Sequence, residues 1–160
     1  MDIEYRRALS GDADGIYFVE AHCFAVPWSF DSIHQDVCLN PDTLYVVALV
    51  RGHVIGFTGM HVVCDEGHIM NMAVLEEYRG QGVGRRLMEE VLSAAPEKVR
   101  SYTLEVRRSN EAAIRLYRRM GFYAVGFRRG YYTQPPEDAL IMWRTTRALG
   151  SDAQDAQNTP

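Results

Sequence analysis

The sequence has no hydrophobic run long enough to cross a membrane. Hydrophobic residues make up 47% of its 160 residues, yet no apolar stretch approaches the roughly 20 residues that a membrane helix needs. The opening segment, MDIEYRRALSGD, contains no apolar region of the kind found in signal peptides. We therefore expect a cytoplasmic protein without a membrane partner.

Cysteine is scarce as well. Cys23, Cys38 and Cys64 are odd in number and form no CxxC pair, which argues against a disulfide framework and favours reduced thiols. His61, Cys64 and His68 form an H-x₂-C-x₃-H pattern that could in principle bind zinc. No fourth ligand with helpful spacing accompanies them, so we expect no metal site.

Positive charge is in deficit. The formal net charge is −4, which argues against broad nucleic-acid binding and would suit a cationic substrate. The length is that of one ordinary domain, which we expect to span residues 1–147. Residues 148–160 lack the apolar side chains of a packed core and are expected to form a disordered tail.

The order of apolar patterns and turn signals predicts a chain that mixes helices and strands. Helices are expected from Asp12 to about Cys23, from Ser29 to about Leu39, from the glycine-rich turn to Pro96, and from Ser109 or Asn110 to Gly121. Strands are expected at 2–7, 44–50, 53–63, 68–75, 102–107, 122–128 and 139–144. The last two should form a hairpin whose loop carries Tyr131 and Tyr132.

The most unusual segment is EYRGQGVGRRL, residues 77–87, which joins a predicted strand to a predicted helix. The first turn of a helix has about four backbone N–H groups without helical partners and about half a positive charge, so it attracts phosphate groups. Gly80, Gly82 and Gly84 let a ligand approach that backbone closely, and three arginines in the same stretch add charge. The segment predicts an anion-binding turn.

Two common nucleotide motifs fit this turn poorly. The Walker pattern needs Lys and Ser or Thr after the last glycine, but Gly84 is followed by two arginines. The dinucleotide pattern GxGxxG is not completed after Gly80 and Gly82 either. ATP and NAD are thereby disfavoured, and a turn whose glycines serve only the backbone geometry stays as the alternative.

Arg79-x-x-Gly82-x-Gly84 matches the Q/R-x-x-G-x-G/A motif by which GNAT-fold acetyltransferases hold the pyrophosphate of acetyl-CoA. The preceding MNMAVLEEYR resembles the fourth strand of that fold. The segment TLEVRRSNEAAIRLYRRMGF, residues 103–122, resembles the RimI-type ribosomal-protein alanine N-acetyltransferases and their archaeal N-terminal acetyltransferase relatives. The resemblance covers about residues 3–145, nearly the whole predicted domain.

The resemblance implies an α/β (α+β) GNAT fold, with a mixed, mostly antiparallel sheet that is splayed at its centre and flanked by helices. Acetyl-CoA would lie in that opening as co-substrate. The residues that the resemblance assigns to it are Met72, Ala73, Val74, Arg79, Gly80, Gln81, Gly82, Val83, Gly84, Arg85 and Asn110. For Asn110 the alternative is a plain helix N-cap.

The resemblance also implies two catalytic residues. Glu105 matches the glutamate proposed as general base in RimI-type enzymes, acting through ordered water, and strand alternation places it opposite Tyr102, Leu104 and Val106. Tyr117 matches the tyrosine that the family uses as general acid. The alternatives are an exposed strand glutamate and a buried core tyrosine.

The substrate follows from proton chemistry together with the resemblance. An attacking amine must lose its proton, which at pH 7 costs about 1 kcal/mol for an α-amine and about 4.6 kcal/mol for a lysine. The segment FAVPWS, which contains Trp28, and the pair Tyr131-Tyr132 resemble the segments that form two walls of a peptide-binding slot in this family. The alternative is that both are simply packed aromatic loops.

The favoured function is therefore acetylation of a protein N-terminus, by resemblance the N-terminal alanine of a small-subunit ribosomal protein. The alternatives are a GNAT enzyme that acetylates a small amine or a lysine side chain, and a non-catalytic acyl-CoA-binding sensor.

Overall fold

The computed structural model describes residues 1–146, which fall into two compact units. The first unit comprises Met1–Val63 and His68–Pro96, and the second comprises Cys64–Gly67 and the chain from Glu97 onward. The predicted tail, 148–160, lies outside the described residues. The two units are described separately below.

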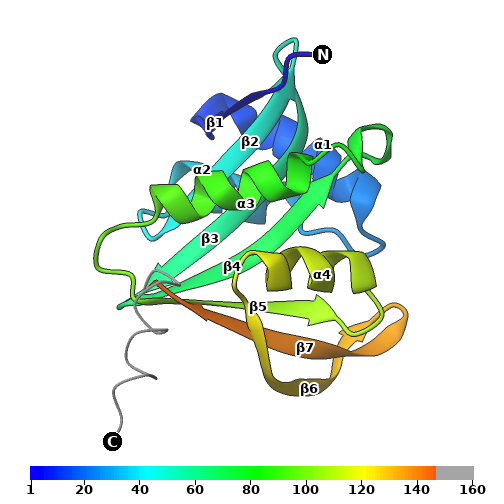
Figure 1. Ribbon diagram of the computed structural model, residues 1–160. Helices are drawn as coiled ribbons and strands as arrows, with labels where there is room; N and C mark the ends of the chain where they lie inside the picture. Colours follow the sequence, from blue (N-terminus) through cyan, green and yellow to red (C-terminus); the bar gives the residue numbers. More distant parts are fainter. Residues whose placement is uncertain (147–160) are drawn as a thin grey trace, which may run out of the picture. The chain divides into compact units, whose positions relative to one another are not determined.

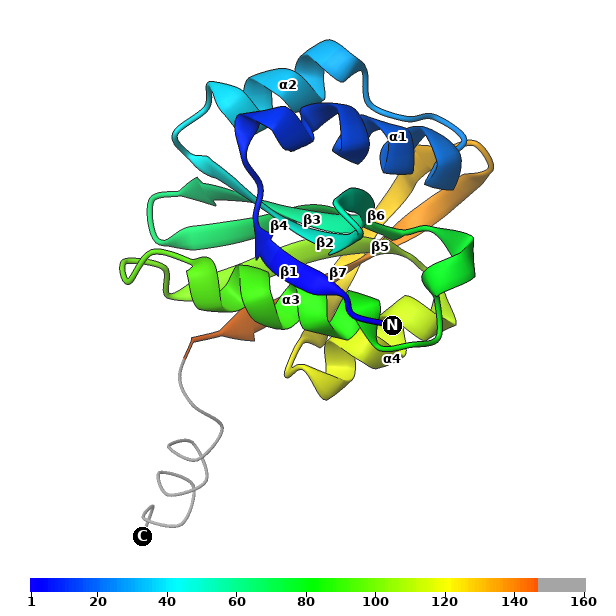
Figure 2. The ribbon, with the colours of Figure 1, turned by 90° about the horizontal axis from the view of Figure 1, so that it is seen from above.

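A four-stranded sheet forms the centre of the first unit. Its order is β1 (Glu4–Arg7), β2 (Thr43–Val50), β3 (His53–Val63) and β4 (Glu66–Val74). β2 pairs antiparallel with both β1 and β3. Figure 2 shows α1 (Ala13–Cys23) and α2 (Phe30–Cys38) on one face of this sheet and α3 (Val83–Ala94) on the other. Because both faces are covered, residues 44–49 of β2 are buried without alternation.

Local sequence signals explain where these helices begin. The Ser29 hydroxyl accepts a hydrogen bond from the Ser32 amide at 3.1 Å and caps α2, as predicted. Asp12 occupies the N-cap position of α1, as predicted, but its side chain makes no capping hydrogen bond. Its carboxylate instead accepts from the Leu9 amide and from the Arg6 guanidinium, both at 2.7 Å, and so fixes the short 3₁₀ helix η1 (Ser10–Asp12).

The core of the first unit lies between α1, α2 and the sheet. Its buried members are Ile16, Val19, Ile33, Tyr45, Val47, Leu49, Val54, Phe57 and Ala73. Ile16, Val19 and Glu20 lie on one face of α1, and all three are buried. α1 approaches the sheet most closely at Gly15, where a Cβ would stand 2.6 Å from Cγ2 of Val54.

The second unit contains three antiparallel strands and one helix. The strand order is β5 (Ser101–Arg107), β7 (Pro136–Thr145) and β6 (Tyr123–Thr133), with Glu105 opposite Ile141. α4 (Glu111–Arg119) follows β5 and lies alongside it (Figure 1). Its buried residues are Ile114 and Tyr117, and Gly121, at φ 92°, follows its end.

The last hairpin differs from the prediction. β6 continues to Thr133 and β7 begins at Pro136, so Tyr131 and Tyr132 belong to a strand and not to the loop. The register shifts between Arg128 and Tyr132, after which Tyr132 pairs with Glu137. Sequence periodicity missed this extension because residues 129–133 are mostly exposed and have no hydrophobic alternation.

We predict that Gly15→Ala lowers the free energy of unfolding by about 1–3 kcal/mol, because the added methyl overlaps Val54 and α1 or β3 must shift. An alanine in an open helical site would be neutral or stabilising. Gly11→Ala is the matched control, since a Cβ there meets nothing within 4 Å. Urea denaturation of both variants tests the prediction, and equal midpoints would contradict it.

Candidate active site

The predicted anion-binding turn leads directly into α3. Gly80 and Gly82 have φ values of 75° and 80°, in the region that favours glycine, and a Cβ on either would meet nothing within 4 Å. Gly82 is the N-cap of α3, and among the described residues no side chain caps this helix end. The first helical hydrogen bond runs from the Arg86 amide to the Gly82 carbonyl, at 3.1 Å.

The amides of Val83, Gly84 and Arg85 precede that bond, so they have no partner within the helix. The first turn of α3 also contains no acidic residue. A negatively charged group placed there would meet oriented N–H groups and the positive end of the helix dipole. The geometry of the turn therefore fits a phosphate or diphosphate.

The arginine side chains near the turn are engaged elsewhere. Arg79 donates from Nε to the Val74 carbonyl at 2.8 Å, and its Nη2 lies 3.6 Å from the Cys23 sulfur. Arg85 and Arg86 pair with Glu89 and Glu90 one turn further along α3. The backbone and the helix dipole, more than the guanidinium groups, therefore form the anion site in this structure.

β4 contains three further predicted cofactor residues, and the short 3₁₀ helix η2 (Glu76–Tyr78) joins this strand to the turn. Ala73 is buried, while Met72 and Val74 are half-buried. β3 runs close to this part of β4, because a Cβ on Gly56 would stand 3.1 Å from the Ala73 carbonyl oxygen. The Val74 carbonyl also accepts a long hydrogen bond from Cys23, at 3.5 Å.

Glu105 lies on β5 in the second unit, and the predicted alternation is confirmed there. Tyr102, Leu104 and Val106 are buried, whereas Glu105 is on the opposite face with its side chain 10% exposed. Its carboxylate pairs with Arg128 of β6 at 3.5 Å. Glu105 is therefore a largely enclosed carboxylate with a charged neighbour, rather than the freely exposed strand glutamate of the alternative interpretation.

Tyr117 is a core residue whose phenol has a raised pKa. Its side chain is 7% exposed and packs against Phe122, with ring centroids 6.0 Å apart. Burial, with a smaller contribution from nearby Tyr132, raises the pKa of Tyr117 to about 12. The phenol is consequently protonated throughout the physiological pH range.

Tyr131 and Tyr132 stand at the end of β6 with their rings edge to face, 5.0 Å apart. Burial and the neighbouring Tyr131 raise the pKa of Tyr132 to about 12. The Arg107 guanidinium stacks 4.3 Å from the Tyr132 ring centroid. The same group donates to the Gln134 and Pro135 carbonyls and so holds the turn between β6 and β7. Sequence analysis missed Arg107, because its partners are about 30 positions away in the chain.

Of the two interpretations of Asn110, the structure shows the helix N-cap. Its side-chain oxygen accepts a hydrogen bond from the Ala113 amide at 3.2 Å and caps α4. The preceding residue is tied down as well, because Ser109 donates from its amide and its hydroxyl to Glu137. These hydrogen bonds hold the pKa of Glu137 below its usual range. Asn110 therefore acts as the N-cap of α4.

Trp28 ends the segment between α1 and α2. Its side chain is half-buried and packs against the core of the first unit. Its amide donates to the carboxylate of Glu20 on α1 at 3.1 Å. The sequence pattern showed only that Glu20 faces inward, and it gave no sign of this contact.

Comparison with known proteins identifies the family to which these features belong. The family model of the GNAT acetyltransferases matches residues 13–122. The chain belongs to the GNAT acetyltransferase family. A Bacillus subtilis relative, a candidate ribosomal protein bS18-alanine N-acetyltransferase, is 42% identical over 135 residues, which are 84% of this chain and 89% of that protein.

Two solved structures of GNAT proteins resemble this one. The ribosomal-protein-S18-alanine N-acetyltransferase of Escherichia coli has a TM-score of 0.83 at 32% identity and covers 94% of this chain and 98% of its own. Arabidopsis thaliana NAA60, solved in complex with acetyl-CoA, has a TM-score of 0.82 at 22% identity, with 92% and 100% covered. The predicted GNAT fold is confirmed, and this GNAT protein is an acetyl-CoA-dependent N-acetyltransferase.

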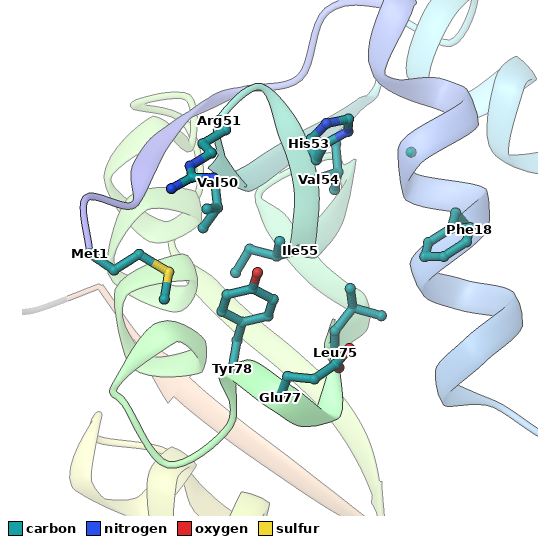
Figure 3. Close-up of a pocket in the computed structure, with 11 residues that line it drawn as sticks. Met1, Phe18, Val50, Arg51, His53, Val54, Ile55, Leu75, Glu77 and Tyr78 are labelled. Carbon is teal, nitrogen blue, oxygen red and sulfur yellow. The ribbon is translucent and has the colours of Figure 1, made fainter.

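A cavity of about 660 Å³ in the first unit of this GNAT enzyme contains none of the predicted site residues. Figure 3 shows Phe18, Ile55 and Tyr78 among the side chains arranged around it. Within residues 1–146 there is no cluster of three or more His, Cys, Asp or Glu side chains that could hold a metal ion. No helix in that same range is long and apolar enough to span a membrane.

We predict that Asn110→Ala lowers the free energy of unfolding by about 1 kcal/mol through loss of the α4 cap. Asn110→Asp keeps the accepting oxygen and should retain the stability of the wild type. Thermal or urea unfolding measures the difference. If Asn110→Ala is as stable as the wild type, the cap contributes nothing to stability.

Proposed function

We propose that this GNAT enzyme transfers the acetyl group of acetyl-CoA to the N-terminal alanine of a small-subunit ribosomal protein. The observation that carries the proposal is the similarity to enzymes named for that reaction, including the Escherichia coli enzyme, 37% identical over 82% of this chain and 89% of its own. The glycine turn and Glu105 support the chemistry. The expected place of the reaction is the cytoplasm.

The turn at the start of α3 would bind the diphosphate of acetyl-CoA. The amides of Val83, Gly84 and Arg85 supply the donors, and the left-handed backbone at Gly80 and Gly82 exposes them. Acetyl-CoA, when bound, supplies an acetyl thioester whose carbonyl carbon accepts the amine. The proposed role of β4, at Met72, Ala73 and Val74, is to hold the pantetheine arm through its backbone.

Glu105 would take the proton that the attacking amine must lose, through an intervening water. The first step forms the N–C bond, and the second breaks the C–S bond and releases a thiolate. An N-terminal amine suits this site better than lysine, because its deprotonation at neutral pH costs about 3.6 kcal/mol less. This difference favours an N-terminus over the alternative lysine substrate.

Tyr117 would assist the departing sulfur. With the pKa of Tyr117 raised to about 12, a complete proton transfer to a thiolate of ordinary pKa near 8.5 would be uphill by about 5 kcal/mol. A hydrogen bond from the phenol to the developing negative charge carries no such cost. We therefore assign Tyr117 the role of hydrogen-bond donor to the leaving group, with the final proton coming from solvent.

Tyr131, Tyr132 and Trp28 would contact the peptide. The Arg107 contacts fix the tyrosine pair on one side. The Glu20 contact fixes the backbone of Trp28. Rigid aromatic walls favour binding of an extended peptide, because little side-chain entropy is lost when the peptide enters.

A peptide panel tests the substrate assignment. We expect purified protein and acetyl-CoA to add one acetyl group to a peptide that begins with the alanine N-terminus of ribosomal protein bS18. The matched control has the same sequence with a blocked N-terminus and an internal lysine, and should remain unmodified. Mass spectrometry reads both, and acetylation confined to the lysine would overturn the assignment.

We predict that Glu105→Gln lowers kcat by about 100-fold or more, because general base catalysis is lost, while the Kd for acetyl-CoA stays within about twofold. Glu111→Gln is the matched control, since the Glu111 side chain is 82% exposed in the same unit. Steady-state kinetics and calorimetry measure both quantities. A non-catalytic acyl-CoA sensor predicts no turnover in any of these proteins.

We predict that Tyr117→Phe lowers kcat by about 10-fold to 100-fold without weakening acetyl-CoA binding. Because burial raises the pKa of Tyr117 to about 12, the wild-type phenol remains protonated up to about pH 11. Any fall in kcat near pH 10 should therefore be the same in the wild type and in Tyr117→Phe. A fall near pH 10 that disappears in the variant would mean that the tyrosine titrates with an ordinary pKa.

A further inference from the structure

The first unit contains a carboxylate that the proposed chemistry does not use. Among residues 1–146 the buried polar side chains are Glu20, Thr58 and Ser101, and of these only Glu20 is ionisable. Glu20 is 1% exposed and lies on α1 among residues of the hydrophobic core. Burying a carboxylate is costly unless hydrogen bonds compensate for the lost water.

The hydrogen bonds of Glu20 join three segments of the first unit. Its Oε1 accepts from the Trp28 amide and from Nδ2 of Asn71 on β4, both at 3.1 Å. Its Oε2 lies 3.2 Å from the same Asn71 nitrogen. Burial raises the pKa of Glu20, and the two donors partly oppose that shift. The carboxylate thus links α1, the residue before the N-cap of α2, and the middle of β4.

These contacts fix both ends of residues 24–29, which we call the α1–α2 loop. At its start the Phe24 amide donates to the Glu20 carbonyl at 3.1 Å as the last hydrogen bond of α1. At its end the Trp28 amide is held by the Glu20 side chain, and Ser29 caps α2. Between these points Val26 is 60% exposed. One glutamate therefore holds both the beginning and the end of this loop.

A second contact strengthens the docking of α1 on β4. Cys23, in the last turn of α1, donates to the Val74 carbonyl at 3.5 Å, and Arg79 donates to the same oxygen. α1 is thereby attached to β4 at Asn71 and again at Val74. Movement of the loop relative to β4 would break at least one of these contacts.

We propose that Glu20 is a positioning residue that fixes the α1–α2 loop against β4, so that the loop presents a preorganised surface to the peptide. This inference rests on the proposed function, because that function supplies the peptide. Glu20 itself is enclosed and does not touch the substrate. Its effect on the reaction is expected in the KM for the peptide and not in the binding of acetyl-CoA.

Glu20→Leu tests the inference, because leucine has a similar volume but accepts no hydrogen bond. The Trp28 amide and the Asn71 amide then lose their partner, and the loop loses its attachment. We expect the peptide KM to rise about tenfold and the KM for acetyl-CoA to change by less than about twofold. Glu20→Gln should restore a near-normal peptide KM, since its oxygen can accept from Trp28 and a turned Asn71 amide can meet its nitrogen.

Val19→Ala is the matched control for general damage to α1. Val19 is fully buried beside Glu20 in the core cluster and takes part in none of the side-chain hydrogen bonds of Glu20. We expect this variant to lose stability but to keep the wild-type peptide KM. An equal rise of KM in Val19→Ala and Glu20→Leu would overturn the inference. If Glu20→Leu does not fold, Glu20→Asp replaces it in the test. Its side chain is one methylene shorter and cannot keep both contacts, so the same tenfold rise in the peptide KM is expected.

A second measurement of the loop attachment does not depend on enzymatic turnover. The chain has two tryptophans, so Trp143→Phe leaves Trp28 as the only one. In that background, Glu20→Leu should increase acrylamide quenching of Trp28 fluorescence at least about twofold, whereas Val19→Ala should not. Unchanged quenching would overturn the loop attachment. A wild-type protein that acetylates no N-terminal amine would instead overturn the proposed function, whatever the quenching shows.

Discussion

The proposed chemistry depends on the open amino end of α3. Gly80 and Gly82 adopt left-handed backbone conformations that other residues rarely take, and no described side chain caps the helix. Three amides at the helix start therefore face outward with the positive end of the helix dipole. A capped helix would be more stable, but its amides would not be available to a diphosphate.

Each unit holds its functional residues through contacts of its own. In the first unit, Glu20 and Cys23 attach α1 to β4, and the short 3₁₀ helix η2 (Glu76–Tyr78) joins that strand to the glycine turn. In the second unit, Arg107 supports the turn beside Tyr132, and Arg128 pairs with Glu105. The residues proposed for catalysis and for binding thus sit on helices and strands with polar supports, which favours a preorganised site.

The sequence predicted the features that depend on neighbouring residues. Ser29 and Asn110 cap helices as their residue types suggest, and the alternation of β5 placed Glu105 opposite the buried side chains. Features that depend on distant partners were not predictable. The Glu20 carboxylate accepts a hydrogen bond from Asn71 at a separation of 51 residues, and Tyr132 belongs to a part of β6 that is defined by its pairing with Glu137 and not by its own pattern. Such contacts leave no periodic signal in the sequence.

Calorimetric titration of acetyl-CoA into the wild type and into Gly82→Ala tests the central claim most directly. An alanine at φ 80° strains the helix start and places a methyl group beside the exposed amides. We predict that the wild type binds acetyl-CoA and that Gly82→Ala binds it at least about tenfold more weakly, while Gly11→Ala binds it normally. Absence of binding by the wild type, or equal affinity in Gly82→Ala, would contradict the account.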